Sequence, residues 1–141
     1  MIDFCILGSG MAGSTIANLL SKNSSVEVFD KARGAGGRSS NRRFKDGASF
    51  DHGLQYISPK NKLFKKFLIN LEKKNIIKKW RGNHLDLSLR IKSFKDKYIG
   101  KKSNSDIPKY LVKNIVTRYK SRVDKIVFKN DHWTILVNDK I

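Results

Sequence analysis

A glycine-rich turn near the N-terminus carries the first residues whose types and spacing could do chemistry. Residues Gly8 to Gly13 read GSGMAG, a full G-x-G-x-x-G sequence. In such a turn Gly8 permits a tight bend, Gly10 lets a pyrophosphate approach the backbone, and Gly13 lets the following helix pack closely on a strand. Asp30 follows Gly13 by 17 residues, where a carboxylate can accept hydrogen bonds from a ribose. These residues predict a dinucleotide-binding site.

The elements that must position these residues are a strand, a helix and a second strand. The apolar run from Ile2 to Leu7 is typical of a buried parallel strand. Val26 to Phe29 predicts a second strand that ends at Asp30. Between them, four apolar residues recur with the spacing of one helix face: Ala12, Ile16, Leu19 and Leu20. A β-α-β unit of this length is the context in which the glycine pattern becomes credible.

The later segments predict short strands, two helices and a hairpin. Phe44 and residues 48–50 are expected to form short strands around a turn at 45–47. Ser105 is placed to cap a helix that carries Ile107, Leu111 and Ile115, and Arg122–Phe128 with Trp133–Val137 predicts a hairpin. Five apolar residues form the stripe of an amphipathic helix whose other face is rich in lysine: Leu63, Phe64, Phe67, Leu68 and Leu71.

A second glycine motif follows Asp30 directly. Lys31 and Arg33 could meet the 2′-phosphate of NADP, and that cofactor stays open as an alternative. Residues 33–39, however, read RGAGGRS. Gly36 and Gly37 would allow close approach of a bulky cofactor, and Arg38 would place a fixed cation beside its phosphates or its ring system. Two glycine motifs at this spacing favour FAD over a nicotinamide nucleotide.

Charge and composition exclude several other classes of protein. The chain has 141 residues and a net charge of +18, yet residues 1–58 hold seven basic and five acidic side chains. The excess lies in the lysines of residues 59–141, which fit solvated faces better than a specific nucleic-acid site.

The single cysteine, Cys5, excludes an internal disulfide and is expected to be a buried apolar residue. No apolar run approaches the ~20 residues of a membrane span, and no secretory signal is visible. The three histidines, His52, His84 and His132, lack the spacing of a metal site. We therefore expect a cytoplasmic location and no metal.

The sequence around the second motif resembles a known family. DKARGAGGRSSNRR followed by FDHGLQY is similar to the bacterial renalase-like branch of the flavin-containing amine oxidase superfamily. The resemblance implies an FAD-dependent oxidoreductase that moves a hydride from a reduced nicotinamide-type compound or an amine to the flavin, and then electrons to dioxygen. It assigns the pyrophosphate to Gly8, Ser9, Gly10 and Met11, and the adenosine ribose to Asp30 with Lys31 nearby. Further cofactor contacts are implied for Gly37, Arg38, Ser39, Gly53, Leu54, Gln55, Tyr56 and, through its backbone, Val123.

The fold class predicted is α/β: a Rossmann-like FAD/NAD(P)-binding domain with a parallel sheet, a helical or irregular insertion and a C-terminal β-hairpin. We expect residues 1–58 to bind the dinucleotide, 59–104 to form an inserted substrate-side segment, and 105–141 to return to the first domain.

Ala35 and Leu54 depart from the family pattern, and Leu54 is large enough to crowd a flavin pocket. The family's enzymes are more than twice this long, so a partner half that supplies the substrate cavity is expected. No catalytic residue is apparent. The alternatives are a truncated or split-gene fragment that binds a dinucleotide without turnover, and an NADP-dependent reductase.

Overall fold

The computed structural model of the protein describes residues 1–82, 84–85, 87–92 and 96–138. It divides into two units, each of which is treated by itself. The first consists of Met1–Arg38 with Pro108–Ile141, and the second of Ser39–Ile107. Residues 139–141, at the end of the predicted third segment, lie outside the described residues.

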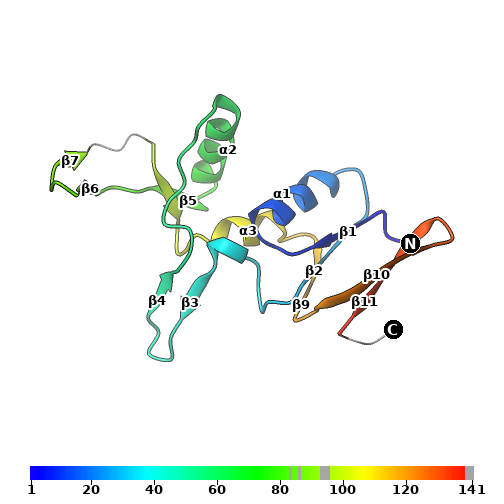
Figure 1. The fold of residues 1–141 in the computed structure, drawn as a ribbon. Coiled ribbons are helices and arrows are strands. Elements are labelled where there is room, and N and C mark those ends of the chain that lie inside the picture. The colour runs from blue at the N-terminus through cyan, green and yellow to red at the C-terminus, as the bar shows by residue number, and fades with distance from the viewer. Residues whose placement is uncertain (83, 86, 93–95, 139–141) are drawn as a thin grey trace. The chain divides into compact units, whose positions relative to one another are not determined.

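A parallel sheet forms the centre of the first unit (Figure 1). Strand β1 (Phe4–Leu7) pairs with β2 (Val26–Asp30), and β2 pairs with β9 (Val116–Tyr119), so that the order is β1-β2-β9. Helix α1 (Met11–Leu20) connects β1 to β2. The predicted α/β class and the predicted β-α-β start are therefore confirmed. The third parallel strand, β9, was not predicted.

Small residues bring α1 close to the sheet. Ser14 and Ala17 are the buried residues of the helix, and Ala17 packs with Val28, Ala35 and Val112 in the core. The apolar spacing predicted the helix correctly but not the face that packs on the sheet. Ile16 and Leu19 are 49% and 58% exposed, because the residues that meet the sheet must be small enough for close approach.

Helix α3 (Asp106–Leu111) ends earlier than the sequence predicts. Pro108 occupies its first turn, where a missing N–H group costs nothing. Ile115 was expected on the same helix, but the chain leaves the helix after Leu111 and Ile115 packs against the core just before β9 begins. The predicted helix was therefore too long by about one turn.

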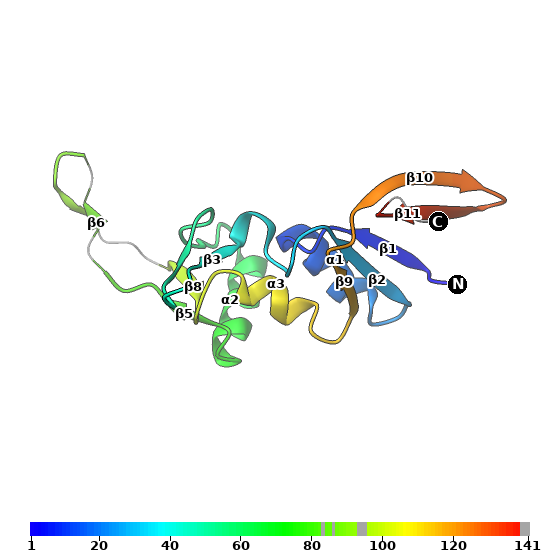
Figure 2. The ribbon, with the colours of Figure 1, turned by 90° about the horizontal axis from the view of Figure 1, so that it is seen from below.

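The C-terminal hairpin is confirmed. Strand β10 (Val123–Lys129) pairs antiparallel with β11 (His132–Val137), and Asn130 and Asp131 take the positive φ angles of a tight two-residue turn. Figures 1 and 2 show this orange and red hairpin beside the blue strand β1. Together they line an open groove of about 920 Å³.

The face of β1 toward this groove corrects two predictions. Cys5, expected to be buried, is exposed and lines the groove. Leu7, at the end of the same strand, is 47% exposed. Both side chains alternate with Ile6, which packs on the helix side of the sheet. Trp133 of β11 is 69% exposed and contacts Phe128 of the opposite strand.

Among its described residues, the second unit contains one longer helix and three small antiparallel strand pairs. Helix α2 (Lys62–Lys73) begins after Asn61, whose side chain accepts a hydrogen bond from the N–H group of Phe64. Of the predicted apolar stripe, Leu68 and Leu71 are buried, whereas Leu63 at the first turn is 80% exposed.

A short 3₁₀ helix, η1 (Gly37–Ser39), spans the boundary between the units. The strand pairs are β3 (Asn41–Arg43) with β4 (Ser49–Asp51), β5 (Ile77–Lys79) with β8 (Tyr98–Gly100), and β6 (His84–Leu85) with β7 (Ile91–Lys92).

The strands predicted around residues 45–47 are confirmed as β3 and β4, with Phe44 next to the turn. The β5–β8 pair was not predicted, and Ile57 joins it through mutual backbone hydrogen bonds with Tyr98. Among the described helices, none is long and apolar enough to cross a membrane.

Candidate functional site

The glycine turn leads directly from β1 into α1. Gly8 has a φ angle of +96°, which favours glycine, and a Cβ atom on Gly13 would lie 2.0 Å from the carbonyl oxygen of Gly8. The close approach predicted for Gly13 is thus present: no side chain fits between the helix and the end of the strand. Gly10 begins the helix without a side-chain cap. The first N–H groups of α1 therefore have no intrahelical partner, and the helix dipole favours negative charge beside them.

The second glycine motif packs against the first. The N–H group of Gly36 donates to the carbonyl oxygen of Ser9 at 3.1 Å, and Gly10 and Gly36 form a parallel bridge. A Cβ atom on Gly37 would lie 3.0 Å from the Cα atom of Gly10. Because backbone meets backbone here, two stretches more than twenty residues apart in the sequence form one continuous loop surface. Arg38, the next residue, is exposed.

Asp30 is tied to the first glycine turn. Its Oδ2 atom accepts hydrogen bonds from the N–H group of Ser9 at 2.7 Å and from the Ser9 hydroxyl at 2.5 Å, and its Oδ1 atom accepts from the N–H group of Ala32 at 2.8 Å. Burial alone would raise the pKa of Asp30, but these hydrogen bonds and the nearby charge of Lys31 outweigh it and hold the pKa below its ordinary value. The carboxylate is therefore ionised and held in one orientation.

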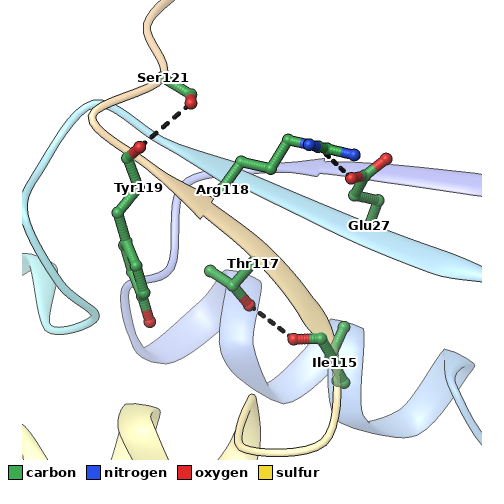
Figure 3. A network of polar contacts seen from close by, with 6 residues as sticks. All are labelled: Glu27, Ile115, Thr117, Arg118, Tyr119 and Ser121. Carbon is green, nitrogen blue, oxygen red and sulfur yellow. Dashed lines mark hydrogen bonds and ion pairs between the residues drawn. The ribbon is translucent and has the colours of Figure 1, made fainter.

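Strand β9 supports Asp30 from the other side. The N–H group of Ser121 donates to the carbonyl oxygen of Asp30, and that of Lys120 donates to the carbonyl oxygen of Ala32. Figure 3 shows the neighbouring contacts: Arg118 pairs with the buried Glu27 of β2, and the Ser121 hydroxyl donates to the carbonyl oxygen of Tyr119. These contacts fix the carboxyl end of β2, where ligands of open α/β sheets bind.

Tyr119 faces the helix side of the sheet. Burial raises the pKa of its hydroxyl, and a hydrogen bond with the backbone of Ala35 only partly opposes that effect. The tyrosine therefore stays neutral and links β9 to Ala35 within the second glycine motif. No pattern in the sequence indicated the supporting role of Tyr119, because that role depends on the β2–β9 register.

The predicted site residues fall into two groups. The first unit brings together the glycine turn, Asp30 and the second motif, and it also contains Val123 at the start of β10. Ser39 is buried at the end of η1. The second unit holds the remaining group, Gly53, Leu54, Gln55 and Tyr56, which follows β4. In that group Tyr56 stacks on Trp80 with ring centroids 5.4 Å apart.

The three histidines lie in separate parts of the chain. Within the part of the chain that the structure describes, no group of three His, Cys, Asp or Glu side chains gathers to hold an ion. His132 contacts the carbonyl oxygen of Asn130 within the hairpin turn, and His52 is exposed. The side chain of His84 lies outside what the structure describes.

A comparison with known families gives a match to the first part of the chain. Residues 6–71 match the family described as the NAD(P)-binding Rossmann-like domain. This segment has a Rossmann-like fold. The matched range contains both glycine motifs and Asp30, the residues that the geometry brings together, and it extends through most of α2.

Solved structures similar to this chain include flavoproteins and other enzymes. A flavoprotein/dehydrogenase from Cytophaga hutchinsonii is 14% identical over 96% of this chain and 34% of its own, with a TM-score of 0.57. The Diels-Alderase PyrE3 of pyrroindomycin biosynthesis is 12% identical over 97% of this chain and 29% of its own, with a TM-score of 0.57. At these identities the likeness establishes the fold.

A third similar structure is a putrescine oxidase, which is 25% identical over 67% of this chain and 22% of its own, with a TM-score of 0.45. The Rossmann-like chain described here therefore spans about a third or less of the length of these solved structures.

Proposed function

We propose that this chain is the cofactor-binding part of an FAD-dependent oxidoreductase of the renalase-like, amine oxidase type. The observation that carries the proposal is the close approach of Gly37 to Gly10. A nicotinamide nucleotide needs the first glycine turn alone, whereas a second glycine motif packed against it extends the backbone surface along a longer cofactor. The fold shared with a flavoprotein supports the same choice.

The residues present fit FAD. Gly8, Gly10 and Met11 would hold the pyrophosphate at the N-terminus of α1, where N–H groups and the helix dipole favour anions. Asp30 would bind the ribose with Lys31 nearby. An ionised carboxylate has about four acceptor positions, and the three described donors to Asp30 leave room for a ribose hydroxyl. Gly53, Leu54, Gln55 and Tyr56 would lie near the isoalloxazine ring of the flavin. The remaining contacts would come from Ser9, Gly37, Arg38, Ser39 and Val123.

The proposed chemistry belongs to the cofactor. A bound flavin would accept a hydride from a reduced small molecule and pass electrons to dioxygen. The chain's own residues would bind and orient it, and no acid or base among them is assigned to the reaction. We propose a reduced nicotinamide-type compound or an amine as substrate, a further polypeptide half that completes the substrate cavity, and a cytoplasmic location.

Cofactor titration of two glycine variants tests the proposal. A Cβ atom on Gly10 would lie 3.7 Å from the nearest atom, the Cα atom of Gly37, and the φ angle of Gly10 is −73°. Gly10→Ala should therefore fold normally, while its methyl group occupies the pyrophosphate position and lowers FAD affinity at least about tenfold. Gly34→Ala is the matched control, since nothing lies within 4 Å of its added carbon. It should bind FAD like the wild type.

The same titration separates the alternatives. Isothermal titration with FAD, ADP and NADPH should show FAD bound more tightly than NADPH. Preference for NADPH, lost on replacing the exposed Arg33, would favour the reductase instead. A folded wild type that binds none of the three would overturn the proposal. FAD binding without reduction by any amine or reduced nicotinamide would leave only the dinucleotide-binding fragment.

A further inference from the structure

A buried amide in the second unit anchors the segment Gly53–Tyr56. Asn104 is 1% exposed, and its Nδ2 atom donates to the carbonyl oxygen of Leu54 at 2.6 Å and to that of Gln55 at 3.4 Å. Its Oδ1 atom accepts from the N–H group of Gly100 at 2.9 Å. One side chain thus connects the segment to the end of β8, about fifty residues further along the chain.

The backbone of Asn104 adds a second connection. Its N–H group donates to both carboxylate oxygens of Asp51, at 3.1 and 3.2 Å, and Asp51 lies two residues before Gly53. Residues 51 to 55 are therefore held at both ends by a single residue. Aspartate does not suit the position because it cannot donate to two carbonyl groups, and a shorter side chain cannot reach all three partners.

The loop that carries Asn104 is itself fixed. Asp106 accepts hydrogen bonds from the N–H groups of Lys102 and Ser103 at 2.8 and 3.1 Å. A Cβ atom on Gly100 would lie 1.7 Å from the carbonyl oxygen of Ser103. The loop can make this turn only with glycine at its start, so the amide of Asn104 is presented from a rigid support.

Anchoring two consecutive carbonyl groups fixes two peptide planes. The planes that contain the carbonyl groups of Leu54 and Gln55 also contain the N–H groups of Gln55 and Tyr56, and these peptide bonds are trans. Those N–H groups therefore point away from Asn104. We propose that Asn104 is a positioning residue that fixes the backbone conformation in which Gly53–Tyr56 would contact a bound flavin. This inference rests on the proposed function, which assigns that segment to the isoalloxazine.

The test compares FAD with ADP, which shares the adenosine and pyrophosphate of FAD but lacks the flavin. Asn104→Asp keeps the acceptor for Gly100 and removes both donors. In the 141-residue chain it should lower FAD affinity about tenfold and leave ADP affinity within about twofold. The visible spectrum of its bound flavin should move toward that of free FAD. Asn104→Ser, whose shorter side chain cannot reach all three partners, should also lower FAD affinity more than ADP affinity.

A matched control comes from the first unit. The Asn18 amide donates to the carbonyl oxygen of Leu111 at 2.9 Å and makes no described contact with Gly53–Tyr56. Asn18→Ser should leave the ratio of FAD to ADP affinity and the flavin spectrum unchanged. Equal weakening of FAD and ADP by Asn104→Asp, or no change in either, would overturn the inference while the proposed function stands. The inference would also be overturned if both Asn104 variants unfolded while Asn18→Ser remained folded. A wild type that binds no FAD would overturn the proposed function and this inference together.

Discussion

The two units fix their predicted cofactor-binding segments in different ways. In the first, backbone packs on backbone: Gly36 donates to Ser9, and Gly37 lies against Gly10. In the second, the side chain of Asn104 reaches the backbone of Leu54 and Gln55. A backbone contact demands glycine and so leaves a visible pattern in the sequence. An amide that binds carbonyl groups fifty residues away leaves none.

The largest expected effect compares what close backbone approach contributes to stability in the two units. Gly13→Ala would place a carbon 2.0 Å from the carbonyl oxygen of Gly8, and Gly100→Ala would place one 1.7 Å from that of Ser103. Because backbone atoms must move in both cases, each variant should lose about 3 kcal/mol of the free energy of unfolding. Urea denaturation followed by circular dichroism measures this loss. A Gly100→Ala variant as stable as Gly34→Ala would mean that the second unit tolerates movement where the first does not.

A smaller effect concerns the side-chain contacts of the second unit. Lys97 is 6% exposed, and its Nζ atom lies 3.5 Å from the ring centroid of Tyr56 and 5.8 Å from that of Trp80. Lys97→Met keeps an unbranched side chain of similar length and removes the cation, so it should cost about 1 kcal/mol in urea denaturation. Lys66→Met, at an exposed position on α2, should change stability by less than ~0.5 kcal/mol. Equal results for the two variants would show that the aromatic contacts of Lys97 stabilise nothing.

The smallest effect appears only in acid and tests the first unit. The pKa of Asp30 is lowered in the folded state, so its ionised form stabilises the fold above the ordinary value of about 3.9. That contribution is lost as the pH falls through the folded-state pKa. Asp30→Asn should be less stable than the wild type at pH 7, and the gap should narrow below about pH 4. Urea midpoints measured from pH 2 to 7 give the difference, and a gap independent of pH would contradict the assignment.

Local pattern predicted the elements whose residues lie close together in the sequence. The β1–α1–β2 start follows from apolar runs and glycines within thirty residues, and the β10–β11 hairpin from alternation around a short turn. Strand β9 was missed because its four residues, Val116–Tyr119, carry no distinctive alternation, and only their register with Glu27–Asp30 makes them a strand. Ile115, the residue before this strand, was assigned to a helix because its segment also carries no distinctive alternation.

Periodicity also failed to show which side of an element is covered. The spacing of Ile16 and Leu19 predicts a helix, but the small residues Ser14 and Ala17 face the sheet. Cys5 lies on an apolar strand and is nevertheless exposed, since its side chain alternates to the groove side of β1. Hydrophobic pattern indicates which residues could be buried. Side-chain volume at the contact decides which of them are.

The features of the candidate site also divide into those that local sequence predicts and those that require the three-dimensional structure. The glycine turn, the second motif and Asp30 could all be predicted, because each depends on a backbone conformation or on the end of a strand. The partners of Asp30 could not, because the reach of Ser9 across the turn and the support from Ser121 require the three-dimensional register. Asn104 belongs to this second kind, and nothing in its neighbourhood of serines and lysines distinguishes it.

The contact between Ser9 and Asp30 has a consequence for the speed of nucleotide exchange. The carboxylate is already oriented by the turn that would receive the phosphates, so an arriving nucleotide need not wait for the two strand ends to order around it. Association should then proceed near the rate set by collision and orientation, with little dependence on which nucleotide arrives. FAD and smaller nucleotides would then differ mainly in their dissociation rates, with FAD remaining bound for longer.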